Sequence, residues 1–505
     1  MVYYSPELIS NAMTIAALLI AACLMIMKRR SMQPNLPGIK PFYAMPTPSG
    51  GGGLLGHLVL LNGNKIHLVL TRWANELGGI FRVRVITEHM LVITDPKLFV
   101  PLLGSGDDAL PKTPLYLDFD QIHSSNEASM FTMPDHTSPK FKIIRKELAL
   151  AFSMKTMKES MHSLMSTGRA LAACWGAGGS IEVLHDIDIA ILDHLLVSSF
   201  KLKFSEDQKI DFMKSLSPAL AEMSLRLANP LRSKLQRFTP FLPSSKKVKN
   251  VMQGSHNVWS MVYDRIKANS PYDATDLSFA ACLWRLESDH GLPPGDVVSN
   301  ISLMMTAGYE TSSGAIAWAL YDIASNPDVL TKLHAELQSA GLLQSASSRP
   351  VTWEDLNLPY LNAVVKESSR VHPVAATGTH RVANKDTCIG GYQVPKGTMV
   401  TIQPGAIHNS IHNWDDPMAF KPERWLEGGK GAENPAYLPF SLGPRNCIGQ
   451  NMAYVTVRVI LLELLSKLKL TVDPRMGSKA DVYANQVLEL TMKHNGGIYL
   501  IPQLL

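Results

Sequence analysis

A loop near the C-terminus carries the side chains with the clearest chemical use. Residues 440–449 read Phe-Ser-Leu-Gly-Pro-Arg-Asn-Cys-Ile-Gly, so one cysteine, Cys447, lies among glycines and closely follows an arginine. A cysteine sulfur stays ionised near neutral pH only beside positive charge, at a helix N-terminus or on a metal. From Asn451 onward apolar side chains recur at helical spacing, which predicts a helix whose positive end lies near Cys447. The loop therefore predicts a stabilised thiolate.

The residues around Cys447 indicate what this thiolate binds. Gly443 and Gly449 allow backbone angles that other residues avoid, so the chain can turn tightly and lie close to a flat macrocycle. Arg445 supplies a permanent cation that suits the propionate carboxylate of a haem. We interpret Cys447 as the axial ligand of a haem iron. The competing interpretation is a buried free thiol, which is the usual state of a lone cysteine.

The loop resembles the Phe-x-x-Gly-x-Arg-x-Cys-x-Gly signature of the cytochrome P450 family. Every fixed position of that signature is matched, by Phe440, Gly443, Arg445, Cys447 and Gly449. The resemblance implies a mainly α fold with small β-sheets (α+β) and haem b as the cofactor. It also implies a monooxygenase that inserts one atom of dioxygen into a lipophilic small molecule, using electrons from NADPH that arrive through a separate reductase.

A second motif lies in a long apolar segment. Residues 296–325 predict a helix that ends before Asn326-Pro327, because proline disfavours a helical residue before it. Within it Ala307, Glu310 and Thr311 are spaced to share one face. A carboxylate on so apolar a helix needs a partner or a proton.

These three positions match the acid–alcohol motif of the P450 family. The match implies that Thr311 holds dioxygen by a hydrogen bond, that Glu310 relays protons and that Ala307 leaves space beside the haem. The competing interpretation is that Thr311 only hydrogen bonds to its own helix and that Glu310 is exposed.

Two more arginines are candidate partners of the haem propionates. Residues 139–152 predict a helix on which Phe141 and Arg145 lie one turn apart. They resemble the Trp-x-x-x-Arg motif of the family, with phenylalanine in place of tryptophan, which implies propionate binding by Arg145 and only packing by Phe141. Arg381 aligns with a third propionate-binding arginine. For Arg145 an exposed surface charge is the alternative.

A set of charged residues is assigned to folding and haem retention. Glu367 and Arg370 resemble the Glu-x-x-Arg motif of the family, and Arg424 resembles the arginine of its later Pro-Glu-Arg element. The resemblance implies that these three side chains form a buried ion network that locks the loop of Cys447.

The N-terminus predicts a membrane anchor. Residues 8–27 are almost free of charge and, as a helix of about 30 Å, would just span the hydrocarbon core of a bilayer. Lys28-Arg29-Arg30 follows, and the positive-inside rule then places the N-terminus in the lumen and the rest in the cytosol. We therefore predict an anchor over residues 1–30, a Pro- and Gly-rich linker over 31–53 and a catalytic domain over 54–505. A cleaved signal peptide is the alternative, although its basic residues should precede the apolar run.

Three segments predict β-hairpins. Alternating apolar residues predict hairpins over residues 80–93, 390–400 and 487–501, the last one turning at Asn495-Gly496.

The net charge of +5 is too small to indicate a nucleic-acid partner, but it is compatible with an acidic protein partner. Five scattered cysteines indicate neither a disulfide framework nor a zinc site.

The anchor pattern predicts a single-pass membrane protein, and the resemblance to the P450 family implies that the membrane is that of the endoplasmic reticulum. The expected partners are NADPH-cytochrome P450 reductase, cytochrome b5 as an optional second donor, the membrane and a lipophilic substrate. That substrate is a sterol, terpenoid, fatty acid or xenobiotic. Two alternatives stay open, a haem-thiolate isomerase or dehydratase that rearranges a peroxide without a reductase, and a non-catalytic membrane haem-binding protein.

Overall fold

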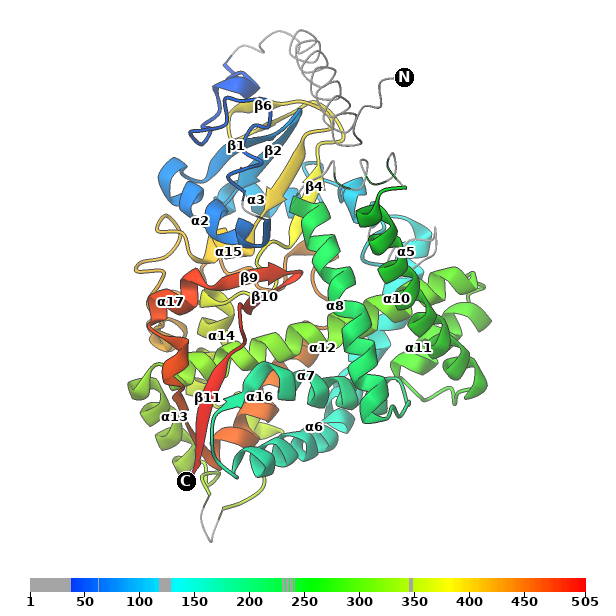
Figure 1. Cartoon of the computed structure of the whole chain (residues 1–505), viewed down its shortest axis with the longest axis vertical. Coiled ribbons are helices and arrows are strands. Elements are labelled where there is room, and N and C mark those ends of the chain that lie inside the picture. Colours follow the sequence, from blue (N-terminus) through cyan, green and yellow to red (C-terminus); the bar gives the residue numbers. More distant parts are fainter. Residues whose placement is uncertain are drawn as a thin grey trace, which may run out of the picture.

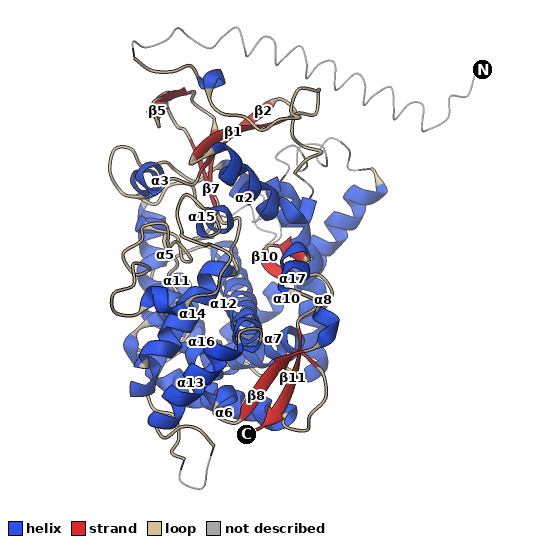
Figure 2. Ribbon diagram, turned by 90° about the vertical axis from the view of Figure 1, so that its left-hand side faces the viewer, coloured by secondary structure: helices blue, strands red, loops and turns tan. Residues whose placement is uncertain are grey.

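Helices fill most of the molecule, and the largest sheet lies at one end of it (Figure 1; Figure 2). The structure is a computed structural model, and it describes residues 38–61, 63–117, 129–228, 232, 236, 239, 241–344 and 348–505. The predicted anchor over residues 8–27 lies outside the described residues. Within the described ranges, no helix combines the length and the apolar character needed to cross a bilayer.

The helices of the described residues agree with the predicted fold class, mainly α with small β-sheets. Their bounds are α2 (Ile66–Leu77), α3 (Pro96–Leu103), α5 (Pro139–Ala149), α6 (Met154–Trp175), α7 (Val183–His194), α8 (Glu206–Ala228), α10 (Pro243–Ala268), α11 (Phe279–Ser288), α12 (Pro294–Ala324), α13 (Pro327–Ser339), α14 (Pro359–Val371), α15 (Pro404–His408), α16 (Gln450–Leu465) and α17 (Lys479–Ala484).

The strands form one sheet of four and three smaller sheets. The large sheet has the order β1-β2-β7-β4, with β2 and β7 parallel and the other neighbours antiparallel. The second sheet has the order β3-β11-β8, and β5-β6 and β9-β10 are two-stranded. The strand bounds are β1 (Ile80–Val85), β2 (Glu88–Ile93), β3 (Ile181–Glu182), β4 (Thr379–Val382), β5 (Thr387–Ile389), β6 (Tyr392–Val394), β7 (Met399–Ile402), β8 (Leu468–Val472), β9 (Gln486–Glu489), β10 (Thr491–His494) and β11 (Tyr499–Leu504).

The predicted hairpins meet different outcomes. The hairpin over residues 80–93 is confirmed as β1 and β2. The hairpin predicted over 390–400 is wrong in extent, because β6 pairs with β5 whereas β7 joins the large sheet. The C-terminal hairpin is wrong in its turn. The chain reverses at Leu490, whose φ is +69°, and β11 beyond Asn495-Gly496 pairs with β3 and β8 instead.

The described part of the predicted linker, residues 38–53, packs against the large sheet. Phe42 is buried among residues of that sheet. Arg84 of β1 donates to the Gly51 carbonyl oxygen at 2.5 Å, and its backbone N–H donates to the His57 ring at 2.9 Å. A side chain at Gly51 would overlap that ring, which explains glycine at this position of the run.

Helix α12 crosses the middle of the molecule (Figure 1) and is buried along most of its length. Pro294 stands at its first turn, where proline costs no hydrogen bond, and it ends two residues before Asn326, as the sequence predicted. The helix packs against α7, α14 and α16. The motif residues of α12 and the helix that follows Cys447 are therefore brought together in the core.

Helices α6 and α16 pack so closely that only glycine fits at one position. The site that a Cβ would take at Gly168 lies 2.6 Å from the Cβ of Glu463. This contact fixes α16, at whose N-terminal end the Cys447 loop lies.

We predict that Gly168→Ala destabilises the protein. Overpacking costs about 1–3 kcal/mol, which exceeds the gain of about 0.5–1 kcal/mol that alanine brings to a helix interior. Gly254→Ala on α10 is the matched control, because the space around Gly254 is open, and it should stabilise slightly. Urea unfolding measures both changes. Equal gains in stability from the two variants would contradict the packing described.

Candidate active site

The backbone of the Cys447 loop is held by its own hydrogen bonds. The N–H of Cys447 donates to the Phe440 carbonyl oxygen at 2.9 Å, and the N–H of Asn446 donates to that of Gly443 at 3.0 Å. The N–H of Gly449 donates to the Cys447 sulfur. Because α16 begins directly after Gly449, the sulfur lies at the positive end of that helix, as the sequence predicted.

The two glycines of the loop make room for protein atoms. Gly443 has a φ of +69°, and a Cβ there would overlap the carbonyl oxygen of Leu103 at the end of α3. A Cβ at Gly449 would lie 3.0 Å from the Phe152 ring. Packing against the surrounding protein alone therefore requires glycine at position 443.

Cys447 lies inside the fold, yet part of its side-chain surface is accessible. Burial raises the pKa of its thiol, while the N–H of Gly449 and the charge of Arg145 act in the opposite direction. The side chain nevertheless has exposed surface, and so does Ala307 in the otherwise buried middle of α12. Free surface at these interior positions indicates an internal space. A metal there would displace the thiol proton, because the thiolate is the ligand form.

Arg145 lies against the Cys447 loop. Ser138 begins α5 by accepting a hydrogen bond from the Phe141 N–H, and Arg145 follows one turn later. Its guanidinium donates to the Asn446 carbonyl oxygen at 3.2 Å and to the Asn446 side-chain oxygen at 2.6 Å. The alternative of an exposed surface charge is therefore wrong. The contacts place Arg145 where it positions the loop and attracts the thiolate.

Arg445 is held between an aromatic ring and backbone oxygens. Its guanidinium carbon lies 4.1 Å from the centre of the Phe141 ring, so Phe141 packs as predicted. It donates to the Met130 carbonyl oxygen at 3.0 Å and also to that of Met133. The phenylalanine that stands at the family's tryptophan position thus stacks on one of the three candidate arginines.

The three candidate arginines crowd one another. Burial first, then Arg381 and Arg145, lower the pKa of Arg445 to about 10. Arg381 is 2% exposed, and within the described part of the chain neither its Nη1 nor the buried Nε of Arg445 has a hydrogen-bond partner. Buried N–H groups of a cation that lack an acceptor are costly, so this cluster fits an anionic group.

The motif residues of α12 do not share one environment. Ala307 is exposed and Thr311 is half-buried, whereas Glu310 is 3% exposed. The Thr311 hydroxyl donates to the Ala307 carbonyl oxygen at 2.7 Å, which is the self-bonding that the competing interpretation expected. The other half of that interpretation, an exposed Glu310, is wrong.

Glu310 is turned toward the C-terminal hairpin. Its Oε1 lies 2.8 Å from the Lys493 Nζ and accepts a hydrogen bond from the Thr491 hydroxyl at 3.0 Å. The position that a Cβ would take at Gly308 lies 3.0 Å from Leu195, so Gly308 makes room for that side chain. The open surface of this motif is therefore that of Ala307 and Thr311.

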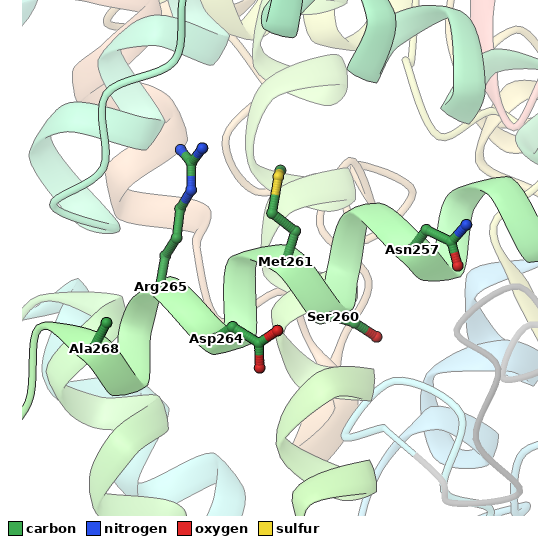
Figure 3. A pocket seen from close by; sticks show the side chains of 6 residues that line it. All are labelled: Asn257, Ser260, Met261, Asp264, Arg265 and Ala268. Atoms are coloured by element: carbon green, nitrogen blue, oxygen red, sulfur yellow. The ribbon is translucent and has the colours of Figure 1, made fainter.

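A shallow groove on α10 is unrelated to these residues. It has a volume of about 500 Å³, and its lining residues all come from that one helix: Asn257, Ser260, Met261, Asp264, Arg265 and Ala268. In Figure 3, Met261 and Arg265 point to one side of the helix, and Asp264 points to the other. The groove contains none of the predicted site residues.

A comparison with protein families decides the identity of the fold. The family described as Cytochrome P450 matches residues 46–499, which is most of the chain. The chain belongs to the cytochrome P450 family. The predicted family is therefore confirmed, and haem is the cofactor that it implies.

Curated relatives of this P450 differ widely in coverage. Cytochrome P450 3A13 of Mus musculus is 38% identical over 190 residues, which are 37% of this chain and 36% of the relative. The mitochondrial 25-hydroxyvitamin D-1 alpha hydroxylase of Homo sapiens is 34% identical over 199 residues, 39% of each chain. The 3-hydroxyindolin-2-one monooxygenase of Zea mays is 25% identical over 517 residues, 98% of this chain and 95% of the relative. The chain thus matches less than two fifths of the length of the first two relatives.

The residues of this P450 fit a haem. Cys447 offers an accessible sulfur, and the unpartnered nitrogen atoms of Arg381 and Arg445 suit the two propionate carboxylates. Arg145 adds positive charge beside the sulfur. The site thus offers a soft sulfur ligand for the iron, and it offers arginine cations for the propionates at one edge of the haem.

The predicted ion network joins α14 to the chain that precedes the Cys447 loop. Glu367 and Arg370 are both 0% exposed and form a two-point ion pair, with Nε to Oε2 at 2.9 Å and Nη2 to Oε1 at 2.8 Å. The Nε of Arg424 lies 3.2 Å from Glu367 Oε1, and the Trp425 indole N–H donates to Oε2 at 2.9 Å.

His408 links this network to the loop. Arg370 donates to the His408 carbonyl oxygen at 2.9 Å, and the His408 ring accepts the N–H of Leu438 at 2.8 Å. Burial lowers the pKa of His408 to about 3, so its ring is neutral and able to accept. A chain of contacts therefore runs from Glu367 to a residue two positions before Phe440.

The sequence analysis missed several residues of this P450 site. Asn446, His408 and Trp425 carry hydrogen bonds that no motif spacing reveals, since their partners are far away in the chain. Asp188 and Lys493, which surround Glu310, were missed as well. One signal was available, because Asp188 lies at helical spacing between Leu184 and Ile191 on the inner side of α7.

We predict that Glu367→Gln both destabilises the protein and weakens haem retention. Removing one partner of a buried ion pair costs about 3–5 kcal/mol, because Arg370 keeps an uncompensated charge. Urea unfolding and the haem content after purification measure the two effects.

Lys421→Ala is the matched control for that substitution. It breaks the exposed pair between Lys421 and Asp416 in the same segment and should leave both readouts unchanged. Wild-type stability in Glu367→Gln would contradict the assigned role of the network.

Proposed function

We propose that this P450 is a haem-thiolate monooxygenase that inserts one atom of dioxygen into a lipophilic small molecule. Electrons come from NADPH through a separate reductase. The observation that carries the proposal is the Cys447 sulfur, which is accessible inside the fold, accepts the Gly449 N–H and lies beside the charge of Arg145. Haem, when bound there, supplies the redox chemistry that dioxygen activation requires.

Different residues of the chain bind the haem and deliver protons in this proposal. Cys447 is the ligand, and Arg445 and Arg381 hold the anionic edge of the cofactor. Ala307 leaves room beside it, and the Thr311 hydroxyl lies on the same open surface of α12. Each turnover takes two electrons and two protons and releases the second oxygen atom as water. The protons must therefore reach an interior position, which is the task we assign to Thr311 and Glu310.

Thr311 needs only a small change to perform this task. Its single hydroxyl proton now goes to the Ala307 carbonyl oxygen at 2.7 Å, which leaves its oxygen free to accept another hydrogen bond. Rotation of the hydroxyl frees that proton for a ligand on the open side. The carboxylate of the adjacent Glu310 is held by Lys493 on the side of the C-terminal hairpin, so in this proposal protons pass from that side to the Thr311 turn.

The proposed cellular setting follows from the N-terminal pattern. We assign an anchor to residues 1–30, with its N-terminus in the lumen of the endoplasmic reticulum and the catalytic domain in the cytosol. The order of an apolar run before Lys28-Arg29-Arg30 supports it. NADPH-cytochrome P450 reductase is the proposed partner, with cytochrome b5 as an optional second one. The substrate class is a sterol, terpenoid, fatty acid or xenobiotic.

We predict that Thr311→Ala diverts electrons from product to hydrogen peroxide. With reductase and NADPH, the product formed per NADPH should fall by about tenfold or more, since positioned proton transfer contributes about 10²–10⁴-fold. A substrate is first found by haem spectral shifts across a lipophile panel. Product analysis then measures the product formed per NADPH, and a peroxide assay measures the hydrogen peroxide released.

Thr331→Ala is the matched control. Its hydroxyl makes the same type of bond, to the Pro327 carbonyl oxygen at 2.9 Å, on the exposed side of α13. It should leave the product yield unchanged. If the protein forms product from an organic hydroperoxide alone, without reductase, the proposal is wrong and the protein is a haem-thiolate isomerase.

A further inference from the structure

Two carboxyl groups lie where α7 packs against α12. Asp188 of α7 and Glu310 of α12 interact electrostatically, and Lys493 of β10 attracts both. The Lys493 Nζ lies 2.8 Å from Glu310 Oε1. Helices α7 and α12 pack along each other, and β10 lies against α12. The cluster is thus built by three segments that are far apart in the sequence.

One oxygen of each carboxyl group is enclosed without a partner. Among the described residues, neither Oε2 of Glu310 nor Oδ1 of Asp188 has a hydrogen-bond partner. An enclosed and unpartnered carboxylate oxygen is costly, and a bound proton removes much of that cost. The geometry therefore favours a proton on Asp188, since the neighbouring Glu310 already pairs with Lys493.

The surrounding charges also favour a proton. Glu182 at the end of β3 and Glu489 at the end of β9 add negative charge, and Lys493 is the cation that acts on Asp188 among the described residues. Burial first, and then Glu310, raise the pKa of Asp188 to about 7, against the opposing effects of Lys493 and Ser313. Tyr309, which also faces both carboxyl groups, stays neutral because the same causes raise its pKa.

Ser313 acts against that proton. Its hydroxyl donates to the Tyr309 carbonyl oxygen at 2.9 Å, and its hydrogen bond with Asp188 lowers the pKa of that carboxyl group. Burial and the charge of Glu310 outweigh this effect, because the pKa of Asp188 is raised to about 7.

We propose that Asp188 is a positioning residue that stores a proton for Glu310. In the step, the O–H bond of the Asp188 carboxyl group breaks and an O–H bond forms on the Glu310 carboxylate, while Lys493 keeps its protons and stabilises the new Asp188 anion. Glu310 then passes the proton toward the Thr311 turn, where it ends in water. The Asp188 anion then takes up a new proton, which solvent ultimately supplies. The inference rests on the proposed function and extends it.

The test compares Asp188→Asn, Asp188→Glu and wild type as full-length holoenzymes over a pH range around 7. The protonated fraction of one group falls roughly tenfold between one pH unit below and one above its pKa. In wild type, the product formed per NADPH should therefore fall as the pH rises through about 7. Asp188→Asn should give a low yield that no longer depends on pH there, and Asp188→Glu should restore the dependence.

A second measurement needs no turnover. Between pH 3.8 and about 7 the folded protein binds the Asp188 proton more tightly than the unfolded chain does. The stability that Asp188 contributes is present below this window and is lost as the pH rises through it. The Tm of wild type should thus fall more steeply with pH than that of Asp188→Asn. The infrared band of a carboxylic acid should vanish from wild type over the same range and be reduced in the variant.

Asp193→Asn is the matched control on the same helix. Asp193 is exposed and pairs with Lys209 at 3.0 Å, so its loss should change neither pH profile. Identical yield profiles for wild type and Asp188→Asn would overturn the inference, as would an unchanged infrared band. A wild type that forms no product with reductase at any pH would instead overturn the proposed function, and the infrared titration would still show whether Asp188 holds the proton.

Discussion

The surroundings of one enclosed sulfur, that of Cys447, are the physical constraint on which the rest of this structure depends. Burial alone drives Cys447 toward the neutral thiol. The fold opposes this with the Gly449 N–H, with the positive end of α16 and with Arg145. Arg145 also holds Asn446, so the group that attracts the sulfur fixes the neighbouring backbone as well.

The scaffold around the loop serves the same end. Gly168 lets α16 approach α6, and the buried pair of Glu367 and Arg370 ties α14 to the chain through His408 and Leu438. None of these residues carries chemistry. Each fixes an element whose displacement would move the sulfur. Because Glu367 and Arg370 are buried, each of these charged groups needs its hydrogen-bond partners in place.

The sequence predicted those features that depend on local pattern. The β1–β2 hairpin and the bounds of α12 follow from alternation and from proline positions, and the structure has both. The C-terminal turn failed because Asn495-Gly496 is the stronger turn signal, whereas the chain turns at Leu490, a residue type that seldom adopts a positive φ. For Glu310 the sequence indicated a need for a partner. The partner, Lys493, lies 183 positions away, and no spacing rule reaches so far.

Cys447→Ala tests the central claim most directly. Wild-type protein, reduced and exposed to carbon monoxide, should show the strongly red-shifted absorbance of a thiolate-bound haem, and Cys388→Ala, which removes an exposed thiol on β5, should retain it. We expect Cys447→Ala to lack that absorbance. If the variant keeps it, residue 447 is not the ligand, and the account of the site is wrong.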